Sequence, residues 1–497
     1  MKSFEDITPT PLQQEVLREL YEFVESEDER VFILRGYAGT GKTTMMRFLV
    51  KELKGGEKIV RLLASTGRAA KVLSDLVEEP KEKSDTGEEE RLASTIHSMI
   101  YSFKGLNKDL SEKEKLTADE TGQLLLMFEM TSIDPEKSPD FIYIVDEASM
   151  VSDKASSLNI QAEYGSGRLL KDLLEYDRKS RSKFIFVGDP CQLPPIEQYF
   201  SPALLPEYFQ KVFGLRTRMR ELTEIIRQED GSSIIEVSKK VREFHSKSPA
   251  DETGYTRVAW GRIPFRGHDD IILHPSESEM LMQYVREVQE HGIDRSICIC
   301  YSNKRAWSVS QWVRRQLNRP PERLVPGDIL MVIQNNKGLD LMNGDFVVVE
   351  EVMGEERMVA NLKFRKVKVR EMYSNRTCTT LLMDDLLYQP RPNLDERQQT
   401  NLFLDFVIRM KKLGITQKKK KAFNDAMLID PYLNALRCVY GYAVTCHKAQ
   451  GGEWDDVYID FPRNITKNPT KGKWQWIYTA MTRAKERIHA KDDFYFN

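Results

Sequence analysis

A glycine-rich stretch near the start of the chain has the spacing of a phosphate-binding loop. The segment GYAGTGKTT fits the pattern G-x-x-x-x-G-K-[S/T], with Gly36, Gly41, Lys42 and Thr43 at its fixed positions. It follows the apolar run VFIL at 31–34 and precedes a helical pattern, which is the context such a loop requires. Its backbone amides and Lys42 would hold nucleotide phosphates, and the Thr43 hydroxyl would ligate Mg²⁺. The rest of the loop adds three residues to this nucleotide site: Gly39, Thr40 and Thr44.

Two adjacent acids follow the next strongly apolar run, FIYIV at 141–145. Asp146 would hold Mg²⁺ through water, and Glu147 would act as the general base that activates a water molecule. A phosphate loop alone binds a nucleotide, but a loop with these two acids can hydrolyse one. The sequence therefore predicts an ATP hydrolase.

A third polar site ends the apolar run in FIFVGDPCQLPPI at 184–196, which contains Asp189 and Gln192. The Gln192 amide can donate to a γ-phosphate and accept from a water molecule. It could therefore report hydrolysis to another surface of the protein. A proline-rich loop without a function is the alternative.

The elements that position these residues form an α/β pattern, because short apolar runs alternate with helical sequence. This pattern predicts a parallel sheet flanked by helices. The same texture returns in SICICYS at 296–302 and VYIDF at 457–461, which predicts a second α/β domain. Between about 322 and 435, short strands with alternating apolar and polar residues predict a small antiparallel barrel. The charged runs at 78–91 and 408–423 are expected to be exposed loops.

Composition limits the classes of protein that remain. A chain of 497 residues divides into several domains. Its net charge of −2 does not exclude a nucleic-acid partner, because phosphate contacts depend on where Lys and Arg cluster. The six cysteines lack the spacing of a zinc site, and no apolar run approaches the length of a membrane span. We therefore expect reduced cysteines and a cytoplasmic protein.

Nine segments, in order, resemble the signature motifs of helicase superfamily 1, and most closely its group B, the RecD- and Dda-like helicases. The segments are TPLQQEVL, GYAGTGKTT, LLASTGRAAKVL, STIHSMI, IVDEASM, VGDPCQLPPI, LTEIIRQ, YAVTCHKAQGGEW and YTAMTRAKE. The resemblance implies two RecA-like parallel-sheet domains, a small hairpin inserted in the first and an SH3-like β-barrel inserted in the second. It places the first domain at 1–200, with the strand-separating hairpin at about 98–140. The second domain then covers 201–321 and 436–497, divided by the insertion at 322–435.

The resemblance also assigns further residues to the nucleotide site. Gln13 would read the adenine edge, since an amide can make paired donor and acceptor contacts. Arg227 and Arg483 would approach the γ-phosphate from the second domain and neutralise charge in the transition state. Gly452 and Glu453 would lie near the ribose and phosphates. Many relatives have serine where Gly452 stands, so this chain departs slightly from the motif.

The remaining motifs resemble segments that contact single-stranded DNA. The implied contacts come from four residues of the first domain and three of the second: Ser65, Thr66, Thr95, His97, Thr445, His447 and Lys448. Hydroxyl groups suit phosphate oxygens, and aromatic side chains in the groove could stack on bases. The sequence does not locate the stacking residue.

The combined expectation is a monomeric helicase that uses ATP and Mg²⁺, moves 5′→3′ on single-stranded DNA and opens duplex junctions. It would act in repair, recombination or replication, in the cytoplasm at the nucleoid. Three alternatives remain open: an ATP-switched nucleic-acid clamp, a translocase that strips proteins without unwinding, and a motor that moves on RNA.

Overall fold

The computed structural model describes the chain as a set of ranges separated by short gaps. They are residues 9–53, 58–77, 93–108, 124–134, 136–155, 162–179, 181–224, 232–247, 263–336, 338–463 and 471–497. Across these ranges, no helix has both the length and the apolar character that a membrane crossing needs.

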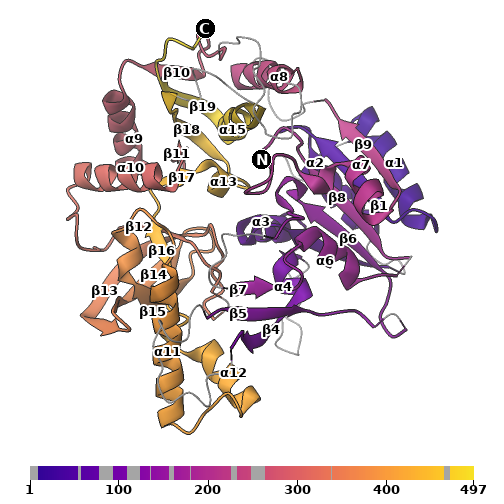
Figure 1. Cartoon of the computed structure of the whole chain (residues 1–497). Coiled ribbons are helices and arrows are strands. Elements are labelled where there is room, and N and C mark those ends of the chain that lie inside the picture. The colour runs from indigo at the N-terminus through magenta and orange to yellow at the C-terminus, as the bar shows by residue number, and fades with distance from the viewer. Residues whose placement is uncertain are drawn as a thin grey trace.

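The first half of the chain forms a six-stranded parallel sheet in the order β3-β2-β6-β8-β1-β9 (Figure 1). The strands are β1 (Val31–Gly36), β2 (Ile59–Ala64), β3 (Ala93–Thr95), β6 (Phe141–Asp146), β8 (Lys183–Gly188) and β9 (Thr217–Leu222). One face packs against helices α1 (Pro11–Glu25) and α2 (Lys42–Leu53), and the other against α4 (Ile96–Ile100) and α6 (Leu169–Tyr176). A third helix, α3 (Gly67–Val77), follows β2. Because both faces are covered, the central strands are continuous apolar runs, and β8 is buried along its whole length.

The predicted domain boundary at residue 200 is wrong, because β9 at 217–222 extends the first sheet beside β1. The segment TRMREL has few apolar residues, since β9 is an edge strand of the sheet. Its arginines pair with acids on or next to α1: Arg218 Nε donates to Glu29 (3.0 Å) and Arg220 Nε to Glu19 (2.6 Å). Charged side chains at a sheet edge hide a strand from a search for apolar runs.

A second parallel sheet has the order β10-β19-β18-β11-β17. Its strands are β10 (Ile271–His274), β11 (Ser296–Cys300), β17 (Ala443–Thr445), β18 (Trp454–Asp460) and β19 (Ala484–Lys491). Its helices are α8 (Ser233–Ser246), α9 (Glu277–His291), α10 (Asn303–Gln316), α13 (Cys446–Ala449) and α15 (Lys471–Met481). The two parallel sheets confirm the predicted α/β fold class.

An antiparallel sheet in the order β15-β14-β13-β12-β16 interrupts the second parallel sheet in the sequence. Its strands are β12 (Ile329–Val332), β13 (Phe346–Val359), β14 (Leu362–Glu371), β15 (Thr377–Met383) and β16 (Cys438–Tyr440). Between β15 and β16 the chain forms helices α11 (Glu396–Lys412) and α12 (Lys420–Ile429). The basic run at 408–423 was expected to be an exposed loop, and most of it is exposed, but its ends belong to α11 and α12, with a loop at 413–419 between them. Phe423 within it is buried.

A small hairpin projects from the first domain between α4 and β6. Strands β4 (Tyr101–Leu106) and β5 (Leu126–Met130) are antiparallel, and β7 (Ala162–Tyr164) adds beside β5. Figure 1 shows the hairpin next to α11 and α12 of the insertion. The contact is apolar, with Leu124 and Phe103 packed among side chains of both helices. Gln417 Nε2 also donates to the carbonyl of Lys108 (2.9 Å), so the insertion braces the hairpin.

Candidate nucleotide site and nucleic-acid interface

The phosphate loop connects β1 to α2 with an open backbone. Gly39 and Gly41 have φ angles of 79° and 77°, a left-handed conformation that strains residues with a Cβ atom. Lys42 begins α2, and its Nζ donates to the carbonyls of Gly36 (2.7 Å) and Tyr37 (2.9 Å). The ammonium group is therefore held over the loop, where phosphates would lie. Thr43 and Thr44 occupy the first turn of the same helix.

The paired acids lie at the end of β6, close to this loop. Asp146 accepts a hydrogen bond from the backbone N–H of Glu147 (2.9 Å), and Glu147 has a left-handed φ of 49°. Burial raises the pKa of Asp146, while the Glu147 amide and Lys42 act in the opposite direction. Burial and the Asp146 carboxylate raise the pKa of Glu147. A carboxylate with a raised pKa is a better proton acceptor, as a general base requires.

The loop after β8 is held by both domains. Asp189 is fully buried, and it accepts from the backbone N–H of Cys191 (2.9 Å). Gln192 is 4% exposed, and its Oε1 has no hydrogen-bond partner within the described part of the chain. Leu193 contacts the second domain, because its N–H donates to Thr479 Oγ1 (2.9 Å). The unpartnered amide oxygen leaves Gln192 able to accept a hydrogen bond from a bound water molecule.

Arg483 reaches the same region from the second domain. Its Nε donates to the carbonyl of Thr479 (3.1 Å) and its Nη1 to the carbonyl of Gly452 (3.2 Å). The guanidinium is near enough to Glu147 to oppose the rise in that residue's pKa. Of the two predicted arginines, Arg483 therefore lies at the site. Arg227 falls at 225–231, outside the residues that the structure describes.

Gly452 stands at a position with little room for a side chain. A Cβ atom at this position would lie 2.5 Å from the Trp454 ring and 3.0 Å from the Arg68 guanidinium. Arg68 stacks over that ring, 4.9 Å from its centroid. Gly452 therefore makes room for this stack, while the neighbouring Glu453 is partly exposed.

Gln13 lies against the phosphate loop, but its amide is already engaged. Its Oε1 accepts from the N–H of Thr10 (3.1 Å) as part of a capping box at the start of α1. Its Nε2 donates to the carbonyl of Thr40 (3.3 Å), and the side chain is 4% exposed. Contact with an adenine would therefore require these bonds to be exchanged.

Two residues of this site were not predicted from the sequence, and both lie on helices of the second domain. Arg242 of α8 stacks over the ring of Tyr37 in the phosphate loop, 3.8 Å from its centroid. Its Nη1 is buried without a hydrogen-bond partner among the described residues. Tyr478 of α15 donates from its hydroxyl to Asp189 (2.8 Å). Tyr478 lies inside the YTAMTRAKE segment, and its position in a largely apolar helix was the only signal.

The predicted strand contacts of the first domain lie next to the acids. Ser65 Oγ donates to the carbonyl of Glu147 (3.4 Å), which connects the expected DNA track to the general base. Thr66 Oγ1 accepts from the N–H of Ala69 (3.2 Å) at the start of α3. Thr95 caps α4 by accepting from the N–H of Ser98 (3.2 Å). The Thr66 and Thr95 hydroxyls thus fix the N-terminal ends of α3 and α4. Both helices begin at the same edge of the sheet.

His97 differs from these residues because aromatic side chains surround it. Its ring lies 5.7 Å from that of Tyr101 and 5.2 Å from that of Tyr164. Burial lowers its pKa to about 4, so His97 is neutral at physiological pH. The side chain therefore offers a ring and a hydrogen-bonding nitrogen, but no charge.

The predicted contacts of the second domain lie around α13. Thr445 and Lys448 line a small hollow with Trp307 of α10. Burial lowers the pKa of Lys448 to about 8 and also lowers that of His447. Trp307 is half-buried, and its Nε1 donates to the carbonyl of Leu387 (3.3 Å). Its indole beside Lys448 is a candidate for the stacking residue that the sequence did not locate.

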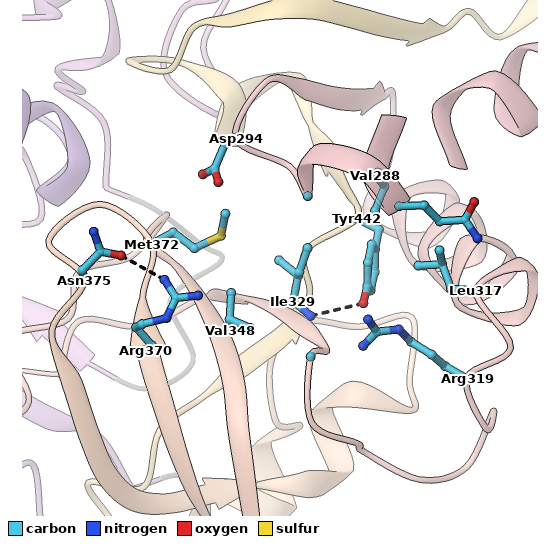
Figure 2. Close-up of a pocket in the computed structure, with 13 residues that line it drawn as sticks. Val288, Asp294, Leu317, Arg319, Ile329, Val348, Arg370, Met372, Asn375 and Tyr442 are labelled. Carbon is cyan, nitrogen blue, oxygen red and sulfur yellow. Dashed lines mark hydrogen bonds between the residues drawn. The ribbon is translucent and has the colours of Figure 1, made fainter. Parts of the chain in front are cut away.

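A separate cavity of about 620 Å³ lies between α9, α10 and the insertion (Figure 2). Two arginines line it, but each already has a protein partner. Arg319 pairs with Asp328 (3.1 Å), and Arg370 donates to Asn375 (2.9 Å). No predicted site residue lines this cavity, so it is distinct from the nucleotide site.

Two family models match the chain in order. Residues 10–257 match a model described as an AAA domain, and residues 440–489 match one described as a UvrD-like helicase C-terminal domain. Together they contain every residue predicted for the nucleotide site and the DNA track. The insertion lies between the two matched regions.

Curated relatives and solved structures are also similar to the chain. A protein of Acanthamoeba polyphaga mimivirus is 21% identical over 523 residues, covering 96% of this chain and 98% of its own length. A protein of Methanocaldococcus jannaschii is 23% identical and covers 93% of this chain, which spans only 36% of that protein. The Bacteroides Pif1 helicase in complex with ADP-AlF3 and ssDNA is 17% identical, with 98% of this chain and 93% of that chain covered and a TM-score of 0.48. The Candida albicans Pif1 helicase is 17% identical, with 98% and 95% covered and a TM-score of 0.43.

Proposed function

We propose that this chain is an ATP-driven DNA helicase of superfamily 1, group B, that moves 5′→3′ on single-stranded DNA. One observation carries the proposal. Lys42 of the phosphate loop and Arg483 of the second domain both lie close enough to Glu147 of the first domain to oppose the rise in its pKa. A site divided between two domains can convert nucleotide hydrolysis into relative movement of the domains.

The residues at this site fit ATP with Mg²⁺. Thr43 and Asp146 would hold the ion, which neutralises charge on the phosphates when bound. Within the described ranges, no cluster of three or more His, Cys, Asp or Glu side chains could hold a metal. Mg²⁺ keeps several water ligands and is commonly bound through one or two protein groups and the phosphates of its substrate, so phosphate oxygens and water would complete its coordination.

Each protein group then has a defined role in hydrolysis. Lys42 binds the β- and γ-phosphates, and Glu147 accepts a proton from the attacking water. Arg483 neutralises charge that develops on the transferred phosphoryl group. Gln192 positions the water through its free amide oxygen, and Gln13 reads the adenine after releasing Thr40. We include Arg227 as the second arginine on the basis of the motif alone.

DNA would cross both domains beside this site. Ser65, Thr66 and Thr95 offer hydroxyls on the first domain, and Thr445 and Lys448 line the hollow on the second. His97 and His447 add imidazole rings, and burial lowers the pKa of each. Because Ser65 bonds to the backbone of Glu147, occupation of the track can be transmitted to the base. The braced hairpin would then meet the duplex at the junction.

The proposal is tested with two partial duplexes, one with a 5′ single-stranded tail and one with a 3′ tail. We expect unwinding from the 5′ tail alone, and none by the Lys42→Ala variant. Unwinding from the 3′ tail would keep the helicase but refute the direction. ATP hydrolysis without unwinding of either duplex would favour a clamp or a protein-stripping translocase. A competition assay, in which DNA and RNA compete to stimulate ATP hydrolysis, distinguishes a motor that moves on DNA from one that moves on RNA.

A further inference from the structure

The hydroxyl of Tyr478 connects three segments of the protein. Tyr478 lies on α15 of the second domain and is 1% exposed. Its hydroxyl accepts from the backbone N–H of Ala38 in the phosphate loop (3.0 Å). It also donates to Oδ2 of Asp189 at the end of β8 (2.8 Å). One side chain of the second domain therefore binds a buried carboxylate and a partly buried backbone N–H of the first.

The buried Asp189 carboxylate has few other hydrogen-bond donors. Asp189 is fully buried, and a buried carboxylate without donors costs free energy. The Asp189 side chain also accepts from the N–H of Cys191 (2.9 Å), and Lys42 acts on it electrostatically. If the two domains separate, the bonds from Tyr478 to both Ala38 and Asp189 must break. The hydroxyl therefore favours the closed arrangement of the domains.

The same helix controls the position of Arg483. Thr479, next to Tyr478, accepts from the N–H of Leu193 (2.9 Å). Arg483 donates from its Nε to the carbonyl of Thr479 (3.1 Å). Docking of this helix on the phosphate loop and on the loop after β8 therefore also places the arginine. A hydrogen bond requires a closer and better aligned contact than apolar packing does.

We propose that Tyr478 is a positioning residue for ATP hydrolysis, whose hydroxyl aligns Arg483 with the phosphate loop when the two domains close. The inference rests on the proposed function of the site. The hydroxyl does not contact the reacting atoms in this scheme. The hydroxyl couples closure of the domains to the placement of Arg483. Loss of the hydroxyl therefore slows the chemical step more than it weakens nucleotide binding.

The test compares Tyr478→Phe with Tyr458→Phe in DNA-stimulated ATP hydrolysis. Tyr458 is also fully buried in the second domain, but its hydroxyl has no hydrogen-bond partner in the described structure, so it is a matched control. We expect Tyr478→Phe to lower kcat about 10-fold or more with KM for ATP within about 3-fold of wild type. Tyr458→Phe should behave like wild type. A kcat for Tyr478→Phe within about twofold of wild type, or a raised KM with normal kcat, would overturn the proposal.

A double-mutant cycle with Asp189→Ala tests whether the two residues act as one unit. If they do, the double variant is no slower than the slower single variant, because either change removes the hydrogen bond between Tyr478 and Asp189. Additive losses would contradict the proposal. Thermal melting shows whether each variant is folded at the assay temperature. If Tyr478→Phe is not folded, Asp189→Ala alone must lower kcat with little change in KM. Wild-type protein without ATP hydrolysis would refute the proposed function, whereas active wild type with a normal Tyr478→Phe variant refutes only this inference.

Discussion

Lys71 of helix α3 forms an ion pair with Asp345 of the insertion, with 2.6 Å between Nζ and Oδ2. Glu371 of β14 approaches the same ammonium group at 2.5 Å. Burial alone would lower the pKa of Lys71, but hydrogen bonds to the two carboxylates outweigh it and raise the pKa. The pair therefore joins a helix of the first domain to a sheet that follows it by more than 250 residues.

Lys71→Met should destabilise this contact, because it removes the hydrogen-bonded cation from two buried carboxylates and leaves Glu371 with the more distant Arg376, at 4.0 Å. The Asp345 and Glu371 side chains are 5% and 3% exposed. We expect the free energy of unfolding to fall by about 3 kcal/mol. It is measured from the midpoint of the first unfolding transition in urea. Lys137→Met is the control, since Lys137 is 84% exposed and pairs with Asp134 at 3.6 Å on the surface. Equal midpoints for the two variants would show that the pair is not stabilising.

Glu147→Gln should separate nucleotide binding from hydrolysis. The amide keeps the shape of the side chain but cannot accept the proton of water, so we expect kcat to fall by about 10²-fold or more. ATP affinity, measured by fluorescence with a labelled nucleotide, should be retained. Glu163→Gln, at an exposed position of β7, should not change turnover. Normal hydrolysis by Glu147→Gln would remove the general-base role.

Lys448 should make DNA affinity depend on pH. Because burial lowers its pKa to about 8, the ammonium is charged below that pH and loses its proton above it. Affinity for a single-stranded oligonucleotide, measured by fluorescence anisotropy, should therefore decline between about pH 7 and 9. Lys448→Arg stays charged over this range and should flatten the profile. The same decline in both proteins would assign the titration to another group.

Trp307 should contribute stacking to the DNA track. Stacking of one base on an aromatic ring is worth about 1–3 kcal/mol, so Trp307→Ala should weaken single-strand binding by roughly 10-fold. Trp307→Phe keeps an aromatic face and should bind almost as well as wild type. Equal affinities for all three proteins would mean that Trp307 supports the fold without contacting DNA.

The parts of the site that were predictable are those that depend on local sequence. Gly41 and Lys42 have fixed spacing around the phosphate loop, and Asp146 follows a continuous apolar strand, so each can be located without knowing the tertiary structure. Arg242 lies in no motif, and Tyr478 lies within YTAMTRAKE but has no local feature that marks its contacts. Their partners lie in the other domain, at Tyr37 and Asp189, and such contacts exist only after the domains pack together.

The same distinction separates the strands and helices that could be predicted from those that could not. Strands buried on both faces, such as β8, appear in the sequence as apolar runs. Strand β9 was missed because its arginines face acids across a sheet edge. Helices α11 and α12 were missed because lysines concealed the apolar positions, such as Phe406 and Phe423, that pack toward the hairpin.

The position of β11 also has a consequence for biosynthesis. This strand lies between β18 and β17, and both are translated only after the insertion is complete. Until then the apolar segment ICIC, buried throughout in the finished sheet, has neither of its neighbours. A nascent chain therefore carries an unpaired central strand for more than 140 residues of translation, and such strands favour aggregation. Early folding of the insertion, or a chaperone, would have to protect this strand until the ribosome supplies its neighbours.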